Sequence, residues 1–392
     1  MGGATVAKYL RLWGDAISVT LVERMPTYTS NIMSSLVLTG QRTMSSLSFS
    51  YDTLRSKYGI TTVFGEVVGI DPVSVKVTLA DGTVLTADRI VMAPGISFDD
   101  VPGLGTSDKM PHAWQAGPQT ALLASQINAM PSGGVMILTI PKTPYRCPPG
   151  PYERACLVAS YFKQHKPKSK VIILDANEEV ASKKDLFTKA WADLFSGIVE
   201  YRPENEVKDV EPGTNTAVTE FDKLKADVLN VIPPQRAGAV ATKSGLRLIN
   251  NRWVDVNWLT MESTSTPNVH VLGDAVFPAP VMPKSGNMAN QQGKLAAAAL
   301  LNLLAGRAPN PAPVVMNTCY SFVDAKNVIH VASVHQFDAD KKQPMPVQGA
   351  GGVSAMANEL EGKAALAWAR KLAAQAPPSH EEEWTSPGSL DT

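Results

Sequence analysis

Two apolar segments separated by a helical pattern limit the possible folds of this chain more than any other feature. The first segment spans 134–140, the helical pattern spans 152–164, and the second apolar segment, 171–175, ends on an acid. Strands that are apolar on both faces and are joined through a helix are typical of parallel sheets, because the helix covers one face of the sheet. This β–α–β pattern therefore predicts an α/β protein.

The N-terminal residues indicate a second unit of the same kind. Gly2 and Gly3 begin a helical pattern, and a β-rich run at 17–23 ends on Glu23, 20 positions after Gly3. This spacing is typical of a dinucleotide-binding unit, in which glycines let the backbone approach a pyrophosphate and an acid holds a ribose. Only the end of the glycine pattern is present, and we expect the first strand of this unit to be missing. A helix that merely begins with two glycines explains the same residues, so the motif alone leaves both interpretations open.

The loop between the two apolar segments argues against a nucleotide in the unit at 134–175. Backbone N–H groups of a glycine-rich turn bind a pyrophosphate in such units. Residues 141–151 contain five prolines instead, and proline has no N–H to donate. We therefore expect this unit to have the fold of a nucleotide-binding domain without the nucleotide.

A later strand ends where a doubly wound sheet binds its ligand. A β-rich run at 268–272 precedes Gly273 and Asp274, and a helical pattern extends from about 287 to 304. An acid at the carboxyl end of a strand, beside a helix N-terminus, is typical of ligand sites in such sheets. The predicted organisation is a first dinucleotide-binding domain in two parts (1–100 and 225–310), a second domain without the glycine pattern (101–224), a small α+β C-terminal domain (311–375) and a polar tail expected to be disordered (376–392).

The composition excludes several classes of function. Lys and Arg number 36 and Asp and Glu number 36, so the chain lacks the basic character of a general nucleic-acid-binding protein. No apolar run reaches the ~20 residues of a transmembrane helix. Three cysteines are too few for a disulfide framework but suffice for one redox pair. The histidines show no metal-ligand spacing, so we expect no metal site.

Several motifs together resemble one flavoprotein family. Residues 145–154 read Tyr-Arg-Cys-Pro-Pro-Gly-Pro-Tyr-Glu-Arg, residues 317–321 read Asn-Thr-Cys-Tyr-Ser, and residues 93–95 read Ala-Pro-Gly. With the N-terminal helix entry, Glu23 and Gly273-Asp274, they resemble the flavoprotein subunit of flavocytochrome c sulfide dehydrogenase. Sulfide:quinone oxidoreductases are more distant relatives. The resemblance implies two Rossmann-like domains of the FAD-dependent disulfide-reductase type, with FAD across the first.

The resemblance also implies how the chain contacts FAD. Gly2 and Gly3 would face the pyrophosphate, Glu23 the adenosine ribose and Asp274 the ribityl chain, and the helix entered at Asn287 would point its N-terminus at the pyrimidine edge of the flavin. Lys284 either holds that anionic edge or is solvated. The full predicted set is Gly2, Gly3, Glu23, Arg24, Asn31, Ala93, Gly95, Gly273, Asp274, Lys284, Ser285 and Asn287.

One departure from the family concerns the attachment of FAD. Several members attach it covalently through a cysteine in the segment that corresponds to residues 28–34. The position that matches this cysteine is Asn31, which cannot form a thioether. We therefore predict non-covalent FAD.

The resemblance assigns the chemistry to two cysteines. Cys147 and Cys319 would form a disulfide beside the flavin, with Cys319 nearer to it and Cys147 receiving the sulfur of an attacking hydrosulfide. Arg146 would lower the pKa of Cys147. The alternative is that both are ordinary buried small residues, which is our interpretation of Cys156. Glu153 is either the proton acceptor for hydrogen sulfide or a first-turn acid that complements the helix dipole.

The expected function is oxidation of hydrogen sulfide, with electrons passing through FAD to a c-type cytochrome subunit in the periplasm. The first alternative is a sulfide:quinone oxidoreductase, for which the mildly amphipathic helix predicted at 353–373 could face a membrane. The second is a flavin-binding subunit without turnover. An NAD(P)H-dependent disulfide reductase is not expected, because the cysteines lack the Cys-x4-Cys spacing.

Overall fold

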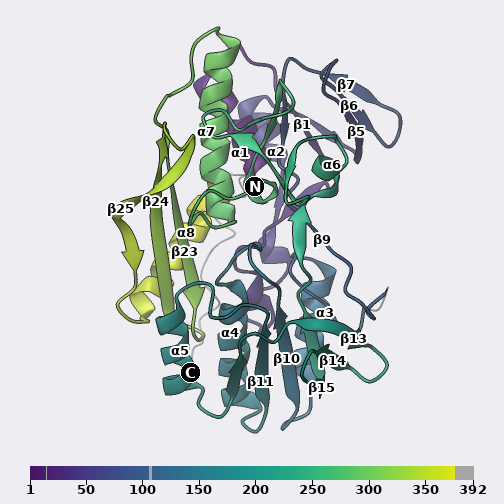
Figure 1. Cartoon of the computed structure of the whole chain (residues 1–392), viewed down its shortest axis with the longest axis vertical. Coiled ribbons are helices and arrows are strands. Elements are labelled where there is room, and N and C mark those ends of the chain that lie inside the picture. Colours follow the sequence, from purple (N-terminus) through teal and green to yellow (C-terminus); the bar gives the residue numbers. More distant parts are fainter. Residues whose placement is uncertain (15, 106–107, 376–392) are drawn as a thin grey trace.

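The computed structural model of this protein describes residues 1–14, 16–105 and 108–375, and the predicted C-terminal tail lies outside them. Two units that each contain a parallel sheet lie one above the other in Figure 1. An antiparallel layer of β23 (Val314–Phe322), β24 (Val328–Asp338) and β25 (Gln343–Val353) lies on the left. The predicted α/β class is confirmed.

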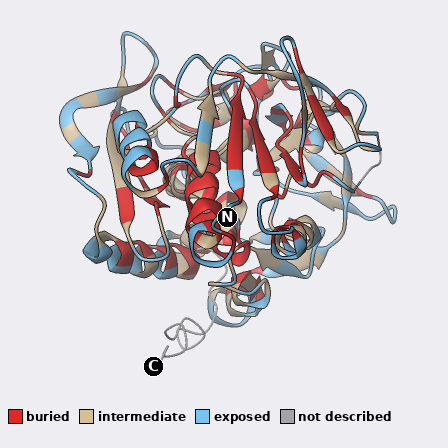
Figure 2. Cartoon of the chain, turned by 90° about the horizontal axis from the view of Figure 1, so that it is seen from below, coloured by how far each residue is buried: buried red, intermediate tan, exposed pale blue. Residues whose placement is uncertain are grey.

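The lower unit is a continuous parallel sheet with buried strands. Its strands β10 (Val135–Ile140), β11 (Lys170–Asp175), β12 (Val199–Arg202) and β16 (Val228–Val231) are ordered β12–β11–β10–β16. Helices α3 (Pro118–Ala129), α4 (Gly150–His165) and α5 (Lys184–Leu194) belong to the core on one side of the sheet. The other face packs against β13 (Val207–Glu211), β14 (Thr216–Thr219) and β15 (Lys223–Lys225). Figure 2 shows buried residues along the strands and exposed residues in the outer loops.

The upper unit has two parallel strand pairs that lie in separate sheets. Strand β1 (Thr20–Glu23) pairs with β4 (Thr61–Phe64), and β8 (Ile90–Met92) pairs with β22 (Val269–Val271). The latter sheet continues through β21 (Glu262–Ser263) and β20 (Val256–Asn257). The upper unit also contains the helices α1 (Gly2–Trp13), α2 (Asp52–Tyr58) and α7 (Gly286–Leu304). An antiparallel meander of β5 (Val67–Asp71), β6 (Lys76–Leu79) and β7 (Val84–Thr86) completes it.

Glycine lets helices α1 and α7 approach each other closely. A Cβ on Gly293 would lie 3.0 Å from the carbonyl oxygen of Gly2, and a Cβ on Gly2 would lie 2.3 Å from Cδ1 of Leu272. The first turn of α1 therefore lies against α7 and against the end of β22.

Several short elements complete the fold, and one pair of them connects the two units. Strand β9 (Ile96–Phe98) of the upper unit pairs with β17 (Gln235–Ala237) and links the two halves in Figure 1. The others are β2 (Thr27–Thr29), β3 (Ser48–Ser50), α6 (Ala239–Thr242), β18 (Leu248–Ile249), β19 (Trp253–Val254) and the 3-10 turns η1 (Ser34–Val37), η2 (Ser45–Leu47) and η3 (Gly273–Ala275).

The C-terminal helix begins later than the sequence predicts. Val353, where the amphipathic pattern starts, is the last residue of β25 and pairs with Val331, and helix α8 runs over Glu359–Gln375. Pairing across strands takes precedence over the local helical periodicity here, because β24 offers a long edge with free backbone groups. Across the described residues, we find no helix that is long and apolar enough to cross a membrane.

Candidate redox site

Cys147 lies in a tight loop between β10 and α4 that is fastened to the start of α7. Its backbone has a φ of 57°, its N–H donates to the carbonyl of Lys284 (2.8 Å), and its own carbonyl accepts from the N–H of Gly150 (2.9 Å). Glycine is needed at 150, because a Cβ there would lie 2.9 Å from the Cys147 sulfur and 2.8 Å from the Trp114 ring. The proline-rich loop thus holds a sulfur in a defined place.

Cys319 lies in the middle of β23 and is also connected to the start of α7. Its sulfur accepts a hydrogen bond from Nδ2 of Asn317 (3.2 Å). The hydroxyl of Ser285 donates to Oδ1 of Asn317 (2.6 Å) and, as the N-cap of α7, accepts from the N–H of Met288 (3.0 Å). Both cysteines are therefore positioned relative to one helix N-terminus.

The structure brings Cys147 and Cys319 into one site as two free thiols. Burial raises the pKa of Cys147 to about 12, and the charges of Cys319 and Glu153 act in the same direction. Such an influence requires short range in a poorly screened environment. Cys156 is fully buried on α4, where its sulfur accepts from Nε1 of Trp191 (3.3 Å), as expected for a core residue. The disulfide between Cys147 and Cys319 stays a prediction.

Glu153 faces the same site from the first turn of α4. Its Oε1 accepts from the N–H of Phe322 on β23 (2.9 Å). Burial raises its pKa to about 7, while that hydrogen bond and the charges of Lys183 and Arg154 oppose the rise. A carboxyl group of this kind exchanges a proton near neutral pH. This behaviour goes beyond that of an exposed acid that only complements the helix dipole.

Two cations flank the cysteines, and sequence analysis missed one of them. Among the charges that lower the pKa of Cys147, Arg146 has the largest effect, followed by Lys183. For Cys319 the largest is Lys183, the N-cap residue of α5, which is 8% exposed. Lys183 lies in a polar stretch with no motif, and only its hydrogen bonds to the carbonyl of Cys319 and the hydroxyl of Ser321 in the folded chain place it beside β23.

Asp274 is the polar residue that best fits a bound cofactor. It lies in η3 after β22, and its Oδ1 is buried without a hydrogen-bond partner in the protein. The adjacent Gly273 N–H donates to Oε1 of Gln292 (2.7 Å), which ties this turn to α7. A narrow cavity between Asp274 and the first turn of α7 is lined by both. A buried carboxylate oxygen without a partner is costly, so it indicates a ligand hydroxyl at this position.

The ammonium of Lys284 is buried and binds groups of the protein rather than solvent. Its ammonium donates to the carbonyls of Asp274 (3.0 Å) and Val276 and lies 3.6 Å from the ring centre of Trp253. Burial lowers its pKa to about 7. The interpretation that Lys284 is solvated is therefore wrong, because the side chain is 4% exposed and its donors hold the turn that carries Asp274.

The acids predicted for the ribose and the ribityl chain, Glu23 and Asp274, both act on Tyr28. Burial raises the pKa of this phenol to about 12, and the charges of Arg146, Asp274 and Glu23 all act on it. Glu23, at the end of β1, accepts from the N–H groups of Arg24 (2.8 Å) and Met25 (3.3 Å). The cofactor residues at the end of β1 and in η3 thus lie near the loop that carries Cys147.

Among the other predicted cofactor residues, some have open space beside them and others already form hydrogen bonds within the protein. A Cβ added to Gly3 would have only the Ala93 side chain within 4 Å, and one added to Gly95 would meet nothing, so both backbones are open to a ligand. Asn31 instead accepts from the N–H of Ala116 (2.7 Å). Arg24 is exposed, Ser285 caps α7, and Asn287, oriented to donate to the carbonyl of Met316 (3.1 Å), accepts from Nε1 of Trp368 (3.0 Å).

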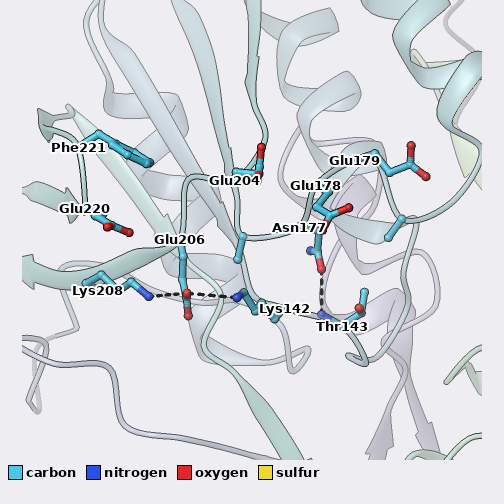
Figure 3. A pocket seen from close by; sticks show the side chains of 12 residues that line it. Lys142, Thr143, Asn177, Glu178, Glu179, Glu204, Glu206, Lys208, Glu220 and Phe221 are labelled. Carbon is cyan, nitrogen blue, oxygen red and sulfur yellow. Dashed lines mark hydrogen bonds and ion pairs between the residues drawn. The ribbon is translucent and has the colours of Figure 1, made fainter.

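The lower unit has a large cavity at the carboxyl ends of its strands, where a nucleotide would bind in a doubly wound fold. The cavity has a volume of about 740 Å³, and Figure 3 shows its lining side chains. Five glutamates line it against two lysines, and that excess of negative charge repels a pyrophosphate. The lining residues are Lys142, Thr143, Ala176, Asn177, Glu178, Glu179, Ala181, Glu204, Glu206, Lys208, Glu220 and Phe221.

The acid that would hold a ribose in this unit is already occupied. Oδ2 of Asp175, at the end of β11, accepts from the hydroxyls of Tyr152 (2.7 Å) and Tyr201 (3.0 Å). Its Oδ1 accepts from the backbone N–H (2.9 Å) and side-chain amide (2.7 Å) of Asn177. These contacts support the expectation that the lower unit binds no nucleotide.

Comparison with protein families identifies two segments of the chain. Residues 120–233 match the central domain of the flavoprotein chain of flavocytochrome c sulfide dehydrogenase, and residues 311–376 match the flavin-binding domain of the same family. The second match confirms the expectation of a flavin cofactor, while its non-covalent attachment stays a prediction.

Individual relatives agree with these matches. The mitochondrial sulfide:quinone oxidoreductase of Mus musculus is 28% identical over 155 residues (36% of this chain, 33% of the relative). That of Dictyostelium discoideum is 25% identical over 234 residues (55% of this chain, 50% of the relative), so the chain spans half or less of the length of these relatives.

Solved structures confirm the fold. The sulfide:quinone oxidoreductase of the bacterium Aquifex aeolicus superposes with a TM-score of 0.78 at 18% identity, covering 97% of this chain and 92% of that one. The putidaredoxin reductase–putidaredoxin complex gives a TM-score of 0.66 at 19% identity, covering 90% and 87%. Both support two dinucleotide-type domains.

Proposed function

We propose that this chain, which matches the central and flavin-binding domains of the flavocytochrome c sulfide dehydrogenase flavoprotein, oxidises hydrogen sulfide through Cys147 and Cys319. The observation that carries the proposal is that both cysteines are hydrogen-bonded to the start of α7, while Glu153 is hydrogen-bonded to the strand that carries Cys319. The N–H of Cys147 donates to the carbonyl of Lys284, and Asn317 links Ser285 to the sulfur of Cys319. The N–H of Phe322 on β23 donates to Glu153.

The residues around the first turn of α7 fit FAD. Asp274 offers a buried oxygen without a partner, and the backbones of Gly3 and Gly95 are open. Ser285, the N-cap of α7, places the positive end of the helix dipole beside Cys319, where negative charge is stabilised by up to ~2 kcal/mol in partly buried geometry. When bound, FAD supplies a two-electron acceptor.

The sulfur chemistry begins from an oxidised Cys147–Cys319 pair. Hydrosulfide attacks the Cys147 sulfur, the Cys147–Cys319 bond breaks, and the products are a persulfide on Cys147 and a thiolate on Cys319. Loss of the persulfide proton and of two electrons then re-forms the bond between the cysteines and releases one sulfur atom at oxidation state zero. The loop of Cys147 and the strand of Cys319 hold the two sulfurs for both steps.

Glu153 is the proton acceptor in this proposal. Its pKa of about 7 leaves a substantial unprotonated fraction at neutral pH, so it can take the proton of hydrogen sulfide and release it again. The N–H of Phe322 fixes Oε1, which leaves the other carboxylate oxygen for the proton.

The electron acceptor we propose is a c-type cytochrome subunit in the periplasm, supported by the two family matches. A sulfide:quinone oxidoreductase is the second candidate, because both curated relatives carry that activity in their names. Reduction of cytochrome c set against reduction of decylubiquinone by the FAD-loaded, sulfide-treated protein distinguishes the two.

The decisive experiment adds sulfide anaerobically to FAD-loaded protein and follows the flavin absorbance. We expect bleaching in the unaltered protein and in Cys156→Ser, a matched control in the core of α4, and none in Cys147→Ser or Cys319→Ser. Bleaching that persists without either sulfur would refute the proposal, and absence of bleaching in the unaltered protein would favour a flavin-binding subunit without turnover.

A further inference from the structure

We propose that Asn317 and Lys183 are positioning residues that stabilise the thiolate of Cys319 when it forms as the leaving sulfur. The inference rests on the proposed function, because it explains why Cys319 rather than Cys147 is the leaving sulfur. It concerns only side chains of this protein and can be measured without substrate.

The donor and acceptor in each hydrogen bond around Asn317 can be assigned. The Ser285 oxygen accepts from the N–H of Met288, so its own proton is available for Oδ1 of Asn317 (2.6 Å). Because Oδ1 accepts that proton, the amide nitrogen of Asn317 must face Cys319, where Nδ2 lies 3.2 Å from the sulfur. A donor aimed at a sulfur favours the anion over the thiol.

This series of donors begins at the N-terminus of α7. Each bond, from Met288 to Ser285 to Asn317, aligns its dipole with the next, and the series ends on Cys319. Asn317 is 2% exposed, so water does not compete for these bonds and their electrostatic effect is little screened. The side chains of Ser285 and Asn317 thereby connect the N-terminus of α7 to the sulfur of Cys319 through hydrogen bonds.

Lys183 supplies the charge. Its ammonium donates to the hydroxyl of Ser321 (2.8 Å) and to the carbonyl of Cys319 (3.1 Å), which fixes it to the strand that carries the sulfur. Lys183 is the largest charge acting to lower the pKa of Cys319, and Cys319 is the largest acting to raise the pKa of Lys183. The ammonium and the sulfur are thus mutual partners.

The other groups around Cys319 do not give the same support. Burial has the largest effect and keeps the pKa of Cys319 above its ordinary value, and Glu153 on α4 acts in the same direction. Lys183, Asn317 and Ser285 oppose this rise. For Cys147, Arg146 replaces Lys183 as the leading cation, and within the described part of the chain no comparable hydrogen bond reaches its sulfur. This asymmetry makes Cys319 the better leaving thiolate.

The test measures thiolate formation one cysteine at a time. The full chain, kept reduced, is treated with iodoacetamide over a range of pH, and mass spectrometry follows the alkylation of each cysteine. We expect the apparent pKa of Cys319 to rise in Lys183→Met and in Asn317→Leu, which slows its alkylation at neutral pH by about tenfold for each unit. Lys183→Arg should restore the rate to within a few-fold. The neighbouring Lys184→Met should leave it unchanged, because Lys184 is exposed and pairs with Glu179.

Cys156 serves as the internal report on folding, because it is fully buried. If a variant exposes Cys156 to the reagent, the decision passes to Asn317→Asp, which keeps the size of the side chain and replaces the donor by an acceptor. A Cys319 profile that stays unchanged in Asn317→Asp overturns the proposal, as does a shift in Lys183→Met that is equally large for Cys147. Failure of sulfide oxidation leaves this measurement untouched, so the two proposals fail separately.

Discussion

An acid follows a strand of a parallel sheet in each half of the molecule, and the two acids have different surroundings. Asp175 follows β11 in the lower unit, and both of its oxygens accept hydrogen bonds from tyrosine hydroxyls or from Asn177. Asp274 follows β22 in the upper unit, and its Oδ1 is buried without a partner. The strand-end acid of a dinucleotide fold thus stabilises the protein where neighbours satisfy it and offers a ligand site where they do not.

The sheets of the two units also differ, in how deeply their strands are buried. Strands β10 and β11 are buried over most of their length within a continuous four-stranded sheet, whereas β1 pairs with β4 alone and its residues are exposed or half-buried. A parallel strand is fully buried only when neighbours cover both edges and both faces. Strands β10 and β11 are therefore more fully buried than β1, and the Cys147 loop and α4 follow directly on β10.

The largest effect that we expect is on stability in the lower unit. Asp175→Ala leaves two tyrosine hydroxyls and the Asn177 amide without their acceptor in the core. The free energy of unfolding should fall by about 3 kcal/mol, since each unmet buried group costs about 1–3 kcal/mol. Urea unfolding measures it, and an FAD affinity that fell as much as the stability would contradict the contrast with Asp274.

The next largest effect that we expect is on the rate of flavin reduction and concerns Glu153 on α4. Glu153→Gln should slow anaerobic flavin bleaching by sulfide about 100-fold, as expected for loss of a general base. In the unaltered protein the rate should rise with pH through about 7, the pKa of Glu153, because only the unprotonated form accepts a proton.

That pH dependence should disappear in Glu153→Gln, which keeps the hydrogen bond from Phe322 but cannot ionise. Stopped-flow absorbance at several pH values provides the check. A variant that retained the same pH dependence would assign it to another group.

A smaller effect is expected at the upper acid. Asp274→Ala removes a carboxylate whose Oδ1 has no hydrogen-bond partner in the protein, and it should weaken FAD binding about tenfold, which corresponds to the ~1.4 kcal/mol of a typical hydrogen bond. Its stability without FAD should fall less than that of Asp175→Ala, because Oδ1 has no hydrogen bond to lose. Flavin fluorescence titration alongside urea unfolding separates the two quantities, and a stability loss as large as that of Asp175→Ala would remove the distinction.

Finally, we expect that NADH does not reduce the flavin. NADH added anaerobically to the FAD-loaded protein should not bleach the flavin, because five glutamates line the lower cavity and Asp175 is occupied. Bleaching by NADH at a rate comparable to that by sulfide would show that the lower unit does bind a nucleotide.

Local patterns were sufficient for much of this protein. The alternation of strand and helix over 134–175, the pair Gly273-Asp274 and the helix from about 287 to 304 are encoded by neighbours in the chain, so their periodicity identified them. The family resemblance of their motifs, rather than any local periodicity, indicated Cys147, Cys319 and Glu153, because the two cysteines are 172 positions apart in the chain.

Other features depend on segments that are distant in the chain. No pattern near Lys183 indicated a role, since its ammonium reaches the carbonyl of Cys319 and the hydroxyl of Ser321 only in the folded chain. Asn317 lies in the motif of Cys319, but its orientation depends on the hydrogen bond from Ser285 at the start of α7. Val353 entered a strand because β24 lies beside it, and Lys284 became a buried donor because Trp253 covers it. A hydrogen bond, a pKa and the burial of a charge are properties of the surroundings in space. Residue types and their spacing therefore indicate which groups are available, and packing decides which of them meet.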